Sequence, residues 1–465
     1  MLAAVTETAP KLAGDASLQA FGYRQELKRS LGLPALIVYG LVFINPTSPF
    51  SIFGIVFNLS HGMVPLVYVI GLGAMLFTAS SYVTMSRAFP VAGSVYSYAG
   101  HGIGPTAGFL AGWALLLDYV LMPTLIYVLC AIAIEALAPG IPRWLSIVVV
   151  LCFNTGINLR GIEASARMNA VLLAVMFAFL ALFFGLGIHA LMHGVAGAHL
   201  STAPLFRADA FSSAVIFSAL SVATLNFLGF DGISTLVEEA RDGARAVGRA
   251  LLWSVCLAAV LFIAATWLAS LFVLDLASFP PGPPTDGAFY TIAEIIGGTW
   301  FKAAASSKVL VAGVAVAAAS QTATARLMYG MARDGRLPRL LAHVHPGRQV
   351  PQRAILFIAA INLVTALVFA NSFELLTTLV CFGALLGFLM LHVSVLVHFR
   401  RRGSSQWLRH GVVPLVGAAI MLYVLWNMSR DAQLVGVAWM VIGWVSWLAV
   451  SRFRGGSRRS PPAGR

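Results

Sequence analysis

Long runs of apolar residues alternate with short polar segments along nearly the whole chain. Each run is about 20 residues long and almost free of charge, which is the length that a helix needs to cross a bilayer. Because lipid offers the backbone no hydrogen-bonding partner, runs of this kind are expected to be helices. A sliding window of about 19 residues predicts twelve spans, near 33–57, 64–86, 105–137, 144–159, 168–192, 211–237, 250–273, 302–328, 354–370, 374–398, 411–427 and 433–451.

The distribution of charge supports this placement. Only 10% of the residues are charged and 59% are hydrophobic, whereas soluble domains carry about 25% charged residues. All but five of the 30 Lys and Arg residues fall in loops on one side, which the positive-inside rule marks as cytoplasmic. The exceptions are Arg143, Arg207, Lys302 and Arg430, on the outside, and Lys308. Lys308 falls near the outer end of the eighth span, where its side chain is expected to reach toward the interface.

The net charge of +13 does not indicate nucleic-acid binding, because the basic residues lie between apolar runs rather than in one patch. The even number of spans predicts both termini in the cytoplasm. Residues 1–30 hold no apolar core long enough for a cleavable signal, so they are expected to form a cytoplasmic segment. The four cysteines lie within apolar runs without partners at metal-ligand spacing. We therefore predict a multi-pass protein of the bacterial inner membrane without disulfides or a metal site.

The first and sixth spans are each interrupted. In the first, Pro46 and Pro49 remove two backbone donors. In the sixth, Gly229 and Gly232 lie on either side of Asp231. Transporters built from inverted repeats bind substrate where helices at equivalent positions of the two halves are broken. Pro and Gly also kink membrane helices without forming a site, but two matched breaks, one with an acid, favour a substrate site.

Two acids are expected within the bilayer. Asp118 falls near the middle of the third span and Asp231 near the second break, and a central Asp costs about 2.5–3.5 kcal/mol on insertion scales. Two carboxylates facing one cavity suit a diamine with a cation at each end, and one of them is able to carry a coupled proton. Tyr119 and Phe230 offer aromatic faces for a cation. The alternatives are that the acids pair structurally and that the aromatics serve packing.

The first break also bears on the substrate. An amino acid's carboxylate is usually held by backbone N–H groups at a half-helix N-terminus, and Pro46 and Pro49 have none. The freed carbonyls around Asn45 remain acceptors for an ammonium group, which favours an amine without a carboxylate. Thr47, Ser48 and the donors after Pro49 keep an amino acid permease or an amine-for-amino-acid exchanger open as the alternative.

Two further groups of polar residues lie near the ends of spans. Glu238 and Glu239 end the sixth span and are interpreted as an inner-gate ion-pair cluster, with a solvated helix end as the alternative. His189, His193 and His199 follow the fifth span without an acid or thiol at matching spacing, so no metal site is predicted and their role stays open.

Several motifs resemble those of the amino acid, polyamine and organocation (APC) transporter superfamily, and are most similar to those of bacterial putrescine importers. The resemblance runs from Leu27 to Arg402, with a weaker trace to the end of the chain. The motifs are Phe89–Ser94 with Tyr96 and Tyr98, Gly112–Trp113 with Leu117–Tyr119, Phe227–Asp231 with Glu238–Glu239, Arg326–Tyr329 with Met331–Gly335, and Phe382–Leu385.

The resemblance implies an all-α polytopic fold with a core at 31–402. In that core, inverted five-helix repeats at 31–195 and 205–402 place the broken helices first and sixth. Two trailing helices at 403–452 and a basic cytoplasmic tail at 453–465 would complete the chain.

The resemblance also implies alternating access driven by a proton or sodium gradient, with Tyr119, Asp231 and the two glutamates in or near the pathway. Two positions depart from the pattern. Met176 stands where many amino acid transporters of the superfamily have a lysine that replaces a coupling sodium. Leu225 stands where an aromatic residue often covers the substrate, which leaves Phe227 or Phe230 as substitutes.

We therefore predict a symporter that imports a small cationic amine, most consistent with putrescine, rather than an enzyme, because no catalytic residues or paired metal ligands are found. No cofactor is expected, the coupling ion is H⁺ or Na⁺, and the oligomeric state stays open. The predicted substrate-binding residues are Asn45, Thr47, Ser48, Asp118, Tyr119, Phe227, Gly229, Phe230 and Asp231, with Glu238 and Glu239 at the inner gate.

Overall fold

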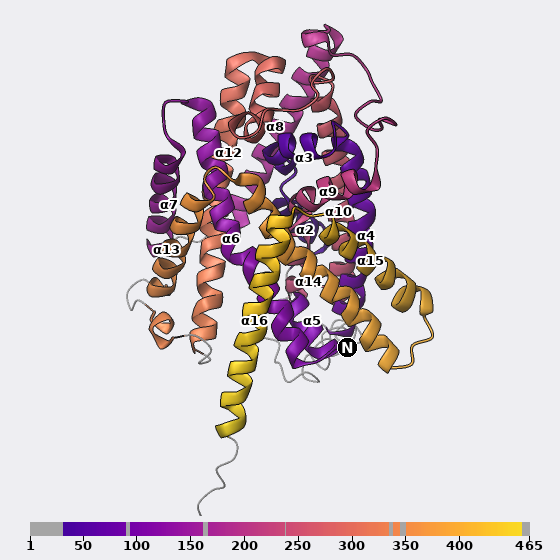
Figure 1. Ribbon diagram of the computed structural model, residues 1–465, viewed down its shortest axis with the longest axis vertical. Coiled ribbons are helices and arrows are strands. Elements are labelled where there is room, and N and C mark those ends of the chain that lie inside the picture. The colour runs from indigo at the N-terminus through magenta and orange to yellow at the C-terminus, as the bar shows by residue number, and fades with distance from the viewer. Residues whose placement is uncertain are drawn as a thin grey trace, which may run out of the picture.

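The computed structural model describes residues 31–89, 94–160, 166–237, 239–333, 338–344 and 350–457, and Figure 1 shows them as one elongated bundle. Within these ranges the regular structure is helical, apart from one isolated bridge between Leu31 and Ala240. The longer α-helices are α4 (Val64–Ala88), α6 (Pro105–Leu137), α7 (Arg143–Arg160), α8 (Ala166–Met192), α10 (Gly243–Ser270), α12 (Ala288–Arg333), α13 (Gln352–Val368), α14 (Phe373–Arg401), α15 (Val413–Trp426) and α16 (Arg430–Ser457).

The shorter elements are concentrated where spans are interrupted or joined. They are the α-helices α2 (Leu33–Ile44), α3 (Phe53–Leu59), α5 (Ser94–Gly102), α9 (Ser213–Ala223) and α11 (Pro283–Asp286), the 3₁₀ helices η1 (Ser48–Ile52), η2 (Val195–Gly197), η3 (Thr224–Phe227), η4 (Phe230–Leu236) and η5 (Arg339–Ala342), and the π-helical turn η6 (Leu408–Val412). Short 3₁₀ pieces of this kind often mark a functional hinge or a strained sequence.

The helices are long and apolar enough to confirm a multi-pass membrane protein. Among the described residues, nine helices meet the length and composition needed to cross a membrane, and Ser213–Phe227 and Gln352–Val368 are shorter apolar helices. Together with α7, these elements cover all of the predicted spans. The count of twelve crossings and the inverted repeat stay predictions.

α6 lies at the centre of the packing, where it contacts α12 and α14. Small residues allow the close approach, as is usual between membrane helices. A Cβ at Gly383 of α14 would lie 2.6 Å from the carbonyl oxygen of Ala114 and 3.2 Å from the backbone nitrogen of Asp118. Gly383 therefore allows the backbone of α14 to lie close against the part of α6 that carries the predicted acid.

One end of the bundle carries arginine-rich segments, and we call it the basic end. The end of α4, the start of α10 and the connection between α14 and α15 line one pocket there. Leu31 is joined to the start of α10: its N–H donates to the carbonyl of Glu239 (3.1 Å), and its carbonyl accepts from the N–H of Arg241 (2.9 Å). Arg401 donates to the carbonyl of Ile103 (3.2 Å), which places the start of α6 at the same end.

The opposite end is tied by an ion-pair network around Arg143. Its guanidinium donates to Glu135 near the end of α6 (2.5 Å), to Asp286 of α11 (2.8 Å) and to the carbonyl of Ala370 (3.1 Å). The side chains of Arg143 and Asp286 are each 7% exposed. This network joins the short helix α11 to the long helices α6 and α7.

Two helices differ from the expectation. α5 fills part of the segment between the second and third spans and is too short for a hydropathy window to detect. α12 begins at Ala288, well before the predicted start of the eighth span, and has non-helical backbone angles at Gly298 (φ 75°, ψ −171°). Only the part after this kink corresponds to the predicted span, because the glycine lets the chain change direction there.

Candidate functional site

The predicted interruption of the first span is confirmed. α2 ends at Ile44, and Asn45 adopts a positive φ of 56° before the chain resumes as η1. The Asn45 side chain accepts hydrogen bonds from the N–H (3.2 Å) and hydroxyl (2.8 Å) of Thr47, while the Ser48 N–H donates to the Asn45 carbonyl (2.8 Å). Asn45, Thr47 and Ser48 therefore stabilise the break by bonding one another.

The sixth span is broken over a longer stretch than predicted. α9 ends at Ala223, and the chain continues as η3 and η4 with an extended Leu228 between them. Gly229 has a φ of 102°, which non-glycine residues rarely adopt. A Cβ at this position would lie 3.0 Å from the carbonyl oxygen of Phe43. Gly229 therefore allows the two broken spans to touch through their backbones.

Asp231 lies directly beside this contact. Its carboxylate accepts hydrogen bonds from the N–H of Gly229 (3.3 Å) and the hydroxyl of Tyr82 on α4 (3.5 Å). The ring of Phe230 packs 5.6 Å from that of Tyr82. The aspartate is half-buried and forms no ion pair among the described residues. A half-buried carboxylate without a counterion is suited to receive a cation.

Asp118 is the second half-buried acid of the region. It lies within electrostatic range of Asp231, so the fold brings together two acids that are far apart in sequence. Its Oδ1 atom is buried and has no hydrogen-bond partner among the described residues. Buried polar atoms are nearly always satisfied in proteins, so this oxygen is available to a ligand.

Aromatic residues surround the two acids. Tyr119 is 43% exposed and Phe43 is 50% exposed. Phe43 stacks on Tyr39, with their ring centroids 4.6 Å apart, and Tyr39 is in electrostatic range of Asp231. Accessible aromatic faces beside carboxylates are the usual surroundings for an organic ammonium group.

Phe227 does not lie with these residues. It is fully buried, and its ring packs 6.1 Å from Tyr68 of α4 and 5.4 Å from Phe262 of α10. Its neighbours thus place it in the packing between η3, α4 and α10. Of the two substitutes expected for the missing aromatic at Leu225, only Phe230 lies beside the acids.

Phenylalanine side chains pack together between the break in the first span and the end of the bundle that holds Arg143. Phe50 stacks on Phe289 (3.8 Å) and packs against Phe183 (4.9 Å), and Phe179 stacks on Phe301 (5.6 Å). Met176, in the place of the family's lysine, is 1% exposed within the same core.

Lys308 corrects one expectation. Its ammonium donates to the hydroxyl of Thr47 and lies 5.6 Å from the ring of Phe179, so it points into the bundle rather than toward the interface. Thr47 is 1% exposed, and Lys308 forms no ion pair among the described residues. Contacts around the broken first span determine the orientation of this side chain. Hydropathy does not predict such contacts.

The predicted gate residues and the histidines remain to be placed. Glu238 is outside the described residues. Glu239 is half-buried, bonds Leu31 through its backbone, and makes no ion pair within the described part of the chain. His193 and His199 are hydrogen-bonded to nearby carbonyls (2.8 and 3.0 Å). No group of three or more potential metal ligands occurs among the described residues.

Sequence reasoning missed Tyr39, Tyr82 and Lys308. Tyr39 lies one helical turn before Phe43, a spacing that puts both on one face of α2. Tyr82 lies in the second span among other hydroxyl residues such as Ser81 and Thr84, so its own hydroxyl carries little signal. For Lys308 the signal was its position inside a span, since a charge at such a position usually faces the bundle interior.

These features describe a multi-pass helical protein with two broken helices and two half-buried carboxylates, one of them on a broken helix. Comparisons with known proteins agree with that class. The chain matches the Amino acid permease family over residues 35–451. It is 34% identical to the low-affinity putrescine importer PlaP of Escherichia coli (strain K12), over 92% of this chain and 95% of that protein.

More distant relatives carry other names. The methylthioribose transporter of Bacillus subtilis (strain 168) is 26% identical over 94% of this chain and 96% of its own length. The branched-chain amino acid permease BcaP of the same organism is 24% identical over 92% of this chain and 94% of its own length. The chain belongs to the amino acid permease family of the APC transporters; it is a transporter rather than an enzyme.

Proposed function

We propose that the chain imports putrescine or a closely related polyamine across the bacterial inner membrane. The observation that carries the proposal is the pair of half-buried acids, Asp118 and Asp231, beside accessible aromatic rings and without basic partners among the described residues. A diamine offers one ammonium to each carboxylate and an alkyl chain to the aromatics. The likeness to a putrescine importer supports the same substrate class.

The mechanism we propose is alternating access over twelve spans arranged as two inverted five-helix repeats, with both termini in the cytoplasm. The accessible rings of Phe43 and Tyr119 lie near the acids, whereas Phe50 and Phe289 close the side toward the opposite end. This pattern supports a conformation open toward the basic, cytoplasmic end. Movement of the first and sixth spans would then expose the acids outward.

A proton is the coupling ion that we propose. When the amine leaves, two neighbouring carboxylates without a cation repel each other. A proton bound to one of them relieves this repulsion and allows the empty transporter to return to its outward-open conformation. A sodium ion would instead need several oxygen ligands at one point.

A second candidate is an amino acid permease, which Lys308 and Thr47 favour. The ammonium of Lys308 at the first break is able to bind a substrate carboxylate, as an amino acid would require. It would repel a cationic amine approaching from that side. The first break therefore favours an amino acid and the paired acids favour an amine.

Uptake by proteoliposomes separates the two candidates. Purified protein would be reconstituted with an imposed proton gradient, and uptake of labelled putrescine would be measured against unlabelled diamines and amino acids. The amine proposal expects gradient-driven uptake that diamines block and amino acids do not, and that is lost in D118N/D231N. The matched control is D209N/D275N, which removes two exposed acids from loops. Uptake by D118N/D231N at the rate of the control variant contradicts the proposal.

A further inference from the structure

A groove lies on the bundle surface at the basic end. Its walls are α4, α10, and the segment from Gln406 to Val413 that connects α14 to α15. Its volume is about 680 Å³, within the range of about 300–1,000 Å³ that is common for ligand sites. The groove shares none of the predicted substrate residues.

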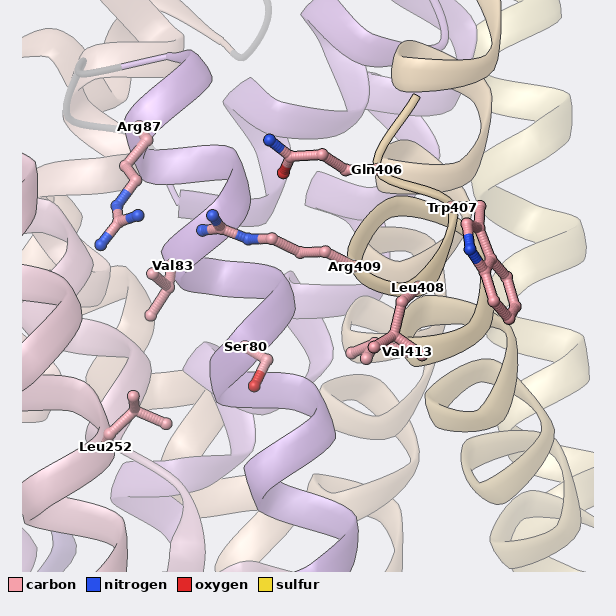
Figure 2. Close-up of a pocket in the computed structure, with 9 residues that line it drawn as sticks. All are labelled: Ser80, Val83, Arg87, Leu252, Gln406, Trp407, Leu408, Arg409 and Val413. Atoms are coloured by element: carbon pink, nitrogen blue, oxygen red, sulfur yellow. The ribbon is translucent and has the colours of Figure 1, made fainter. Parts of the chain in front are cut away.

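The groove is polar at one end and apolar at the other. Figure 2 shows Arg87, Arg409 and Gln406 together at one end, with Leu252 at the far end. Leu408 and Val413 project toward the space between the helices in the same view. A cationic head and an apolar body match the two parts of a phospholipid.

Arg409 is held in place across the groove. It extends from the connecting segment toward α4, where its Nε donates to the hydroxyl of Thr84 (3.3 Å). Its two terminal NH2 groups have no hydrogen bond among the described residues, which leaves both as donors in the planar arrangement that binds phosphate. Arg87, at the end of α4, is exposed on the same side.

The two arginines have no acidic partner. Neither forms an ion pair within the described part of the chain, and the residues that line the groove include no Asp or Glu. Two like charges at one end of a groove repel each other unless an anion lies between them. Trp407 of the same segment is 71% exposed and lies on the side away from the arginines in Figure 2; tryptophan is enriched at the level of lipid headgroups.

We propose that this groove binds one anionic phospholipid of the leaflet at the basic end. Arg87 and Arg409 bind its phosphate, Gln406 bonds the polar headgroup, and an acyl chain runs along Val83, Leu252 and Val413. The lipid joins the segment before α15 to α4 and α10. Free phosphate would bind the same two arginines. The apolar part of the groove, however, favours a phospholipid over free phosphate.

Native mass spectrometry of the detergent-solubilised protein tests this proposal. The protein would be mixed with dioleoylphosphatidylglycerol, with dioleoylphosphatidylcholine, or with inorganic phosphate. The wild type is expected to bind phosphatidylglycerol about 25-fold more tightly than R87Q/R409Q, since each arginine near an anionic surface contributes about a fivefold factor. R87K/R409K keeps the charges but loses the planar donors, so its affinity is expected to lie between those of the wild type and R87Q/R409Q.

The control variant R160Q/R353Q removes two exposed arginines from α7 and α13, which lie away from α4 and α15 in Figure 1. It is expected to bind phosphatidylglycerol as the wild type does. The proposal is overturned if R87Q/R409Q binds this lipid undiminished, if the control loses as much, or if inorganic phosphate alone displaces the lipid. The assay needs no transport, so its outcome is independent of the proposed substrate.

Discussion

The two sides of the broken first span differ in how their aromatic residues are used. Toward the opposite end, Phe50 is 6% exposed and stacked on Phe289, whereas toward the basic end Phe43 is 50% exposed. The break at Asn45 separates them within a few residues. Similar residues thus form a closed barrier on one side and an accessible wall on the other, and the backbone rather than the residue type makes the difference.

The largest expected effect concerns the accessible side. D231N keeps the shape of Asp231 but removes the charge that would bind an ammonium. Loss of one partner of a buried charged pair costs about 2–5 kcal/mol, so putrescine affinity is expected to fall by a factor of about 30 to several thousand. Competition binding in detergent measures this change, with D275N as the control. An unchanged affinity would place the cation elsewhere.

Cysteine labelling tests the comparison directly. In a background without the four native cysteines, F43C is expected to react with a membrane-impermeant thiol reagent from the basic side at least about tenfold faster than F50C, because only an accessible thiolate reacts. Inside-out vesicles and whole cells supply the two directions of access. Equal rates would mean that the two sides of the break are open alike.

The ion-pair network at the opposite end should contribute to stability in a pH-dependent way. Burial raises the pKa of Asp286 above its usual value, and the Arg143 guanidinium acts against this rise. R143Q leaves the carboxylate without a cation, so the pKa rises further and the ionised form becomes more costly. Removing one partner of a buried pair costs about 3–5 kcal/mol, and this loss is expected to be greatest at neutral pH.

The loss in R143Q is expected to shrink as the pH falls through the raised pKa, because the protonated Asp286 needs no cation. Thermal unfolding of wild type and R143Q between pH 4.5 and pH 8, in steps of about one unit, measures the difference. The double variant R143M/D286L removes both charges and serves as the control. A difference that is independent of pH would show that Asp286 is not the group that depends on Arg143.

The smallest effect is expected at Phe227. Its ring packs on Tyr68 and Phe262, away from the acids, so F227L is expected to change putrescine affinity less than about twofold, while the cavity that it leaves costs about 1–3 kcal/mol of stability. F230L, beside Tyr82, is expected to weaken binding more. Binding isotherms of the two variants compare them, and a larger effect for F227L would restore its predicted role at the substrate.

Periodicity and hydropathy predicted the helices well, because crossing a bilayer constrains length and composition strongly. The first break was predictable for a similar reason: Pro46 and Pro49 remove two backbone donors close together, whereas a single proline, Pro123, is accommodated inside the continuous helix α6. The position of Asp118 beside Asp231 depended instead on an assumed topology. The orientations of Phe227 and Lys308 depend on which neighbours fill the space around them, and a linear pattern holds no such information.

The bridge between Leu31 and Ala240 connects the approach to the first span with the residues that follow the sixth. Both of its hydrogen bonds use main-chain atoms, the N–H of Leu31 and the N–H of Arg241. Single side-chain substitutions other than proline keep both of these main-chain hydrogen bonds, so a scan of such variants is not expected to detect the bridge. Only proline at position 31 or 241 removes a donor, so a proline scan is the genetic screen that would reveal whether the two broken helices travel together.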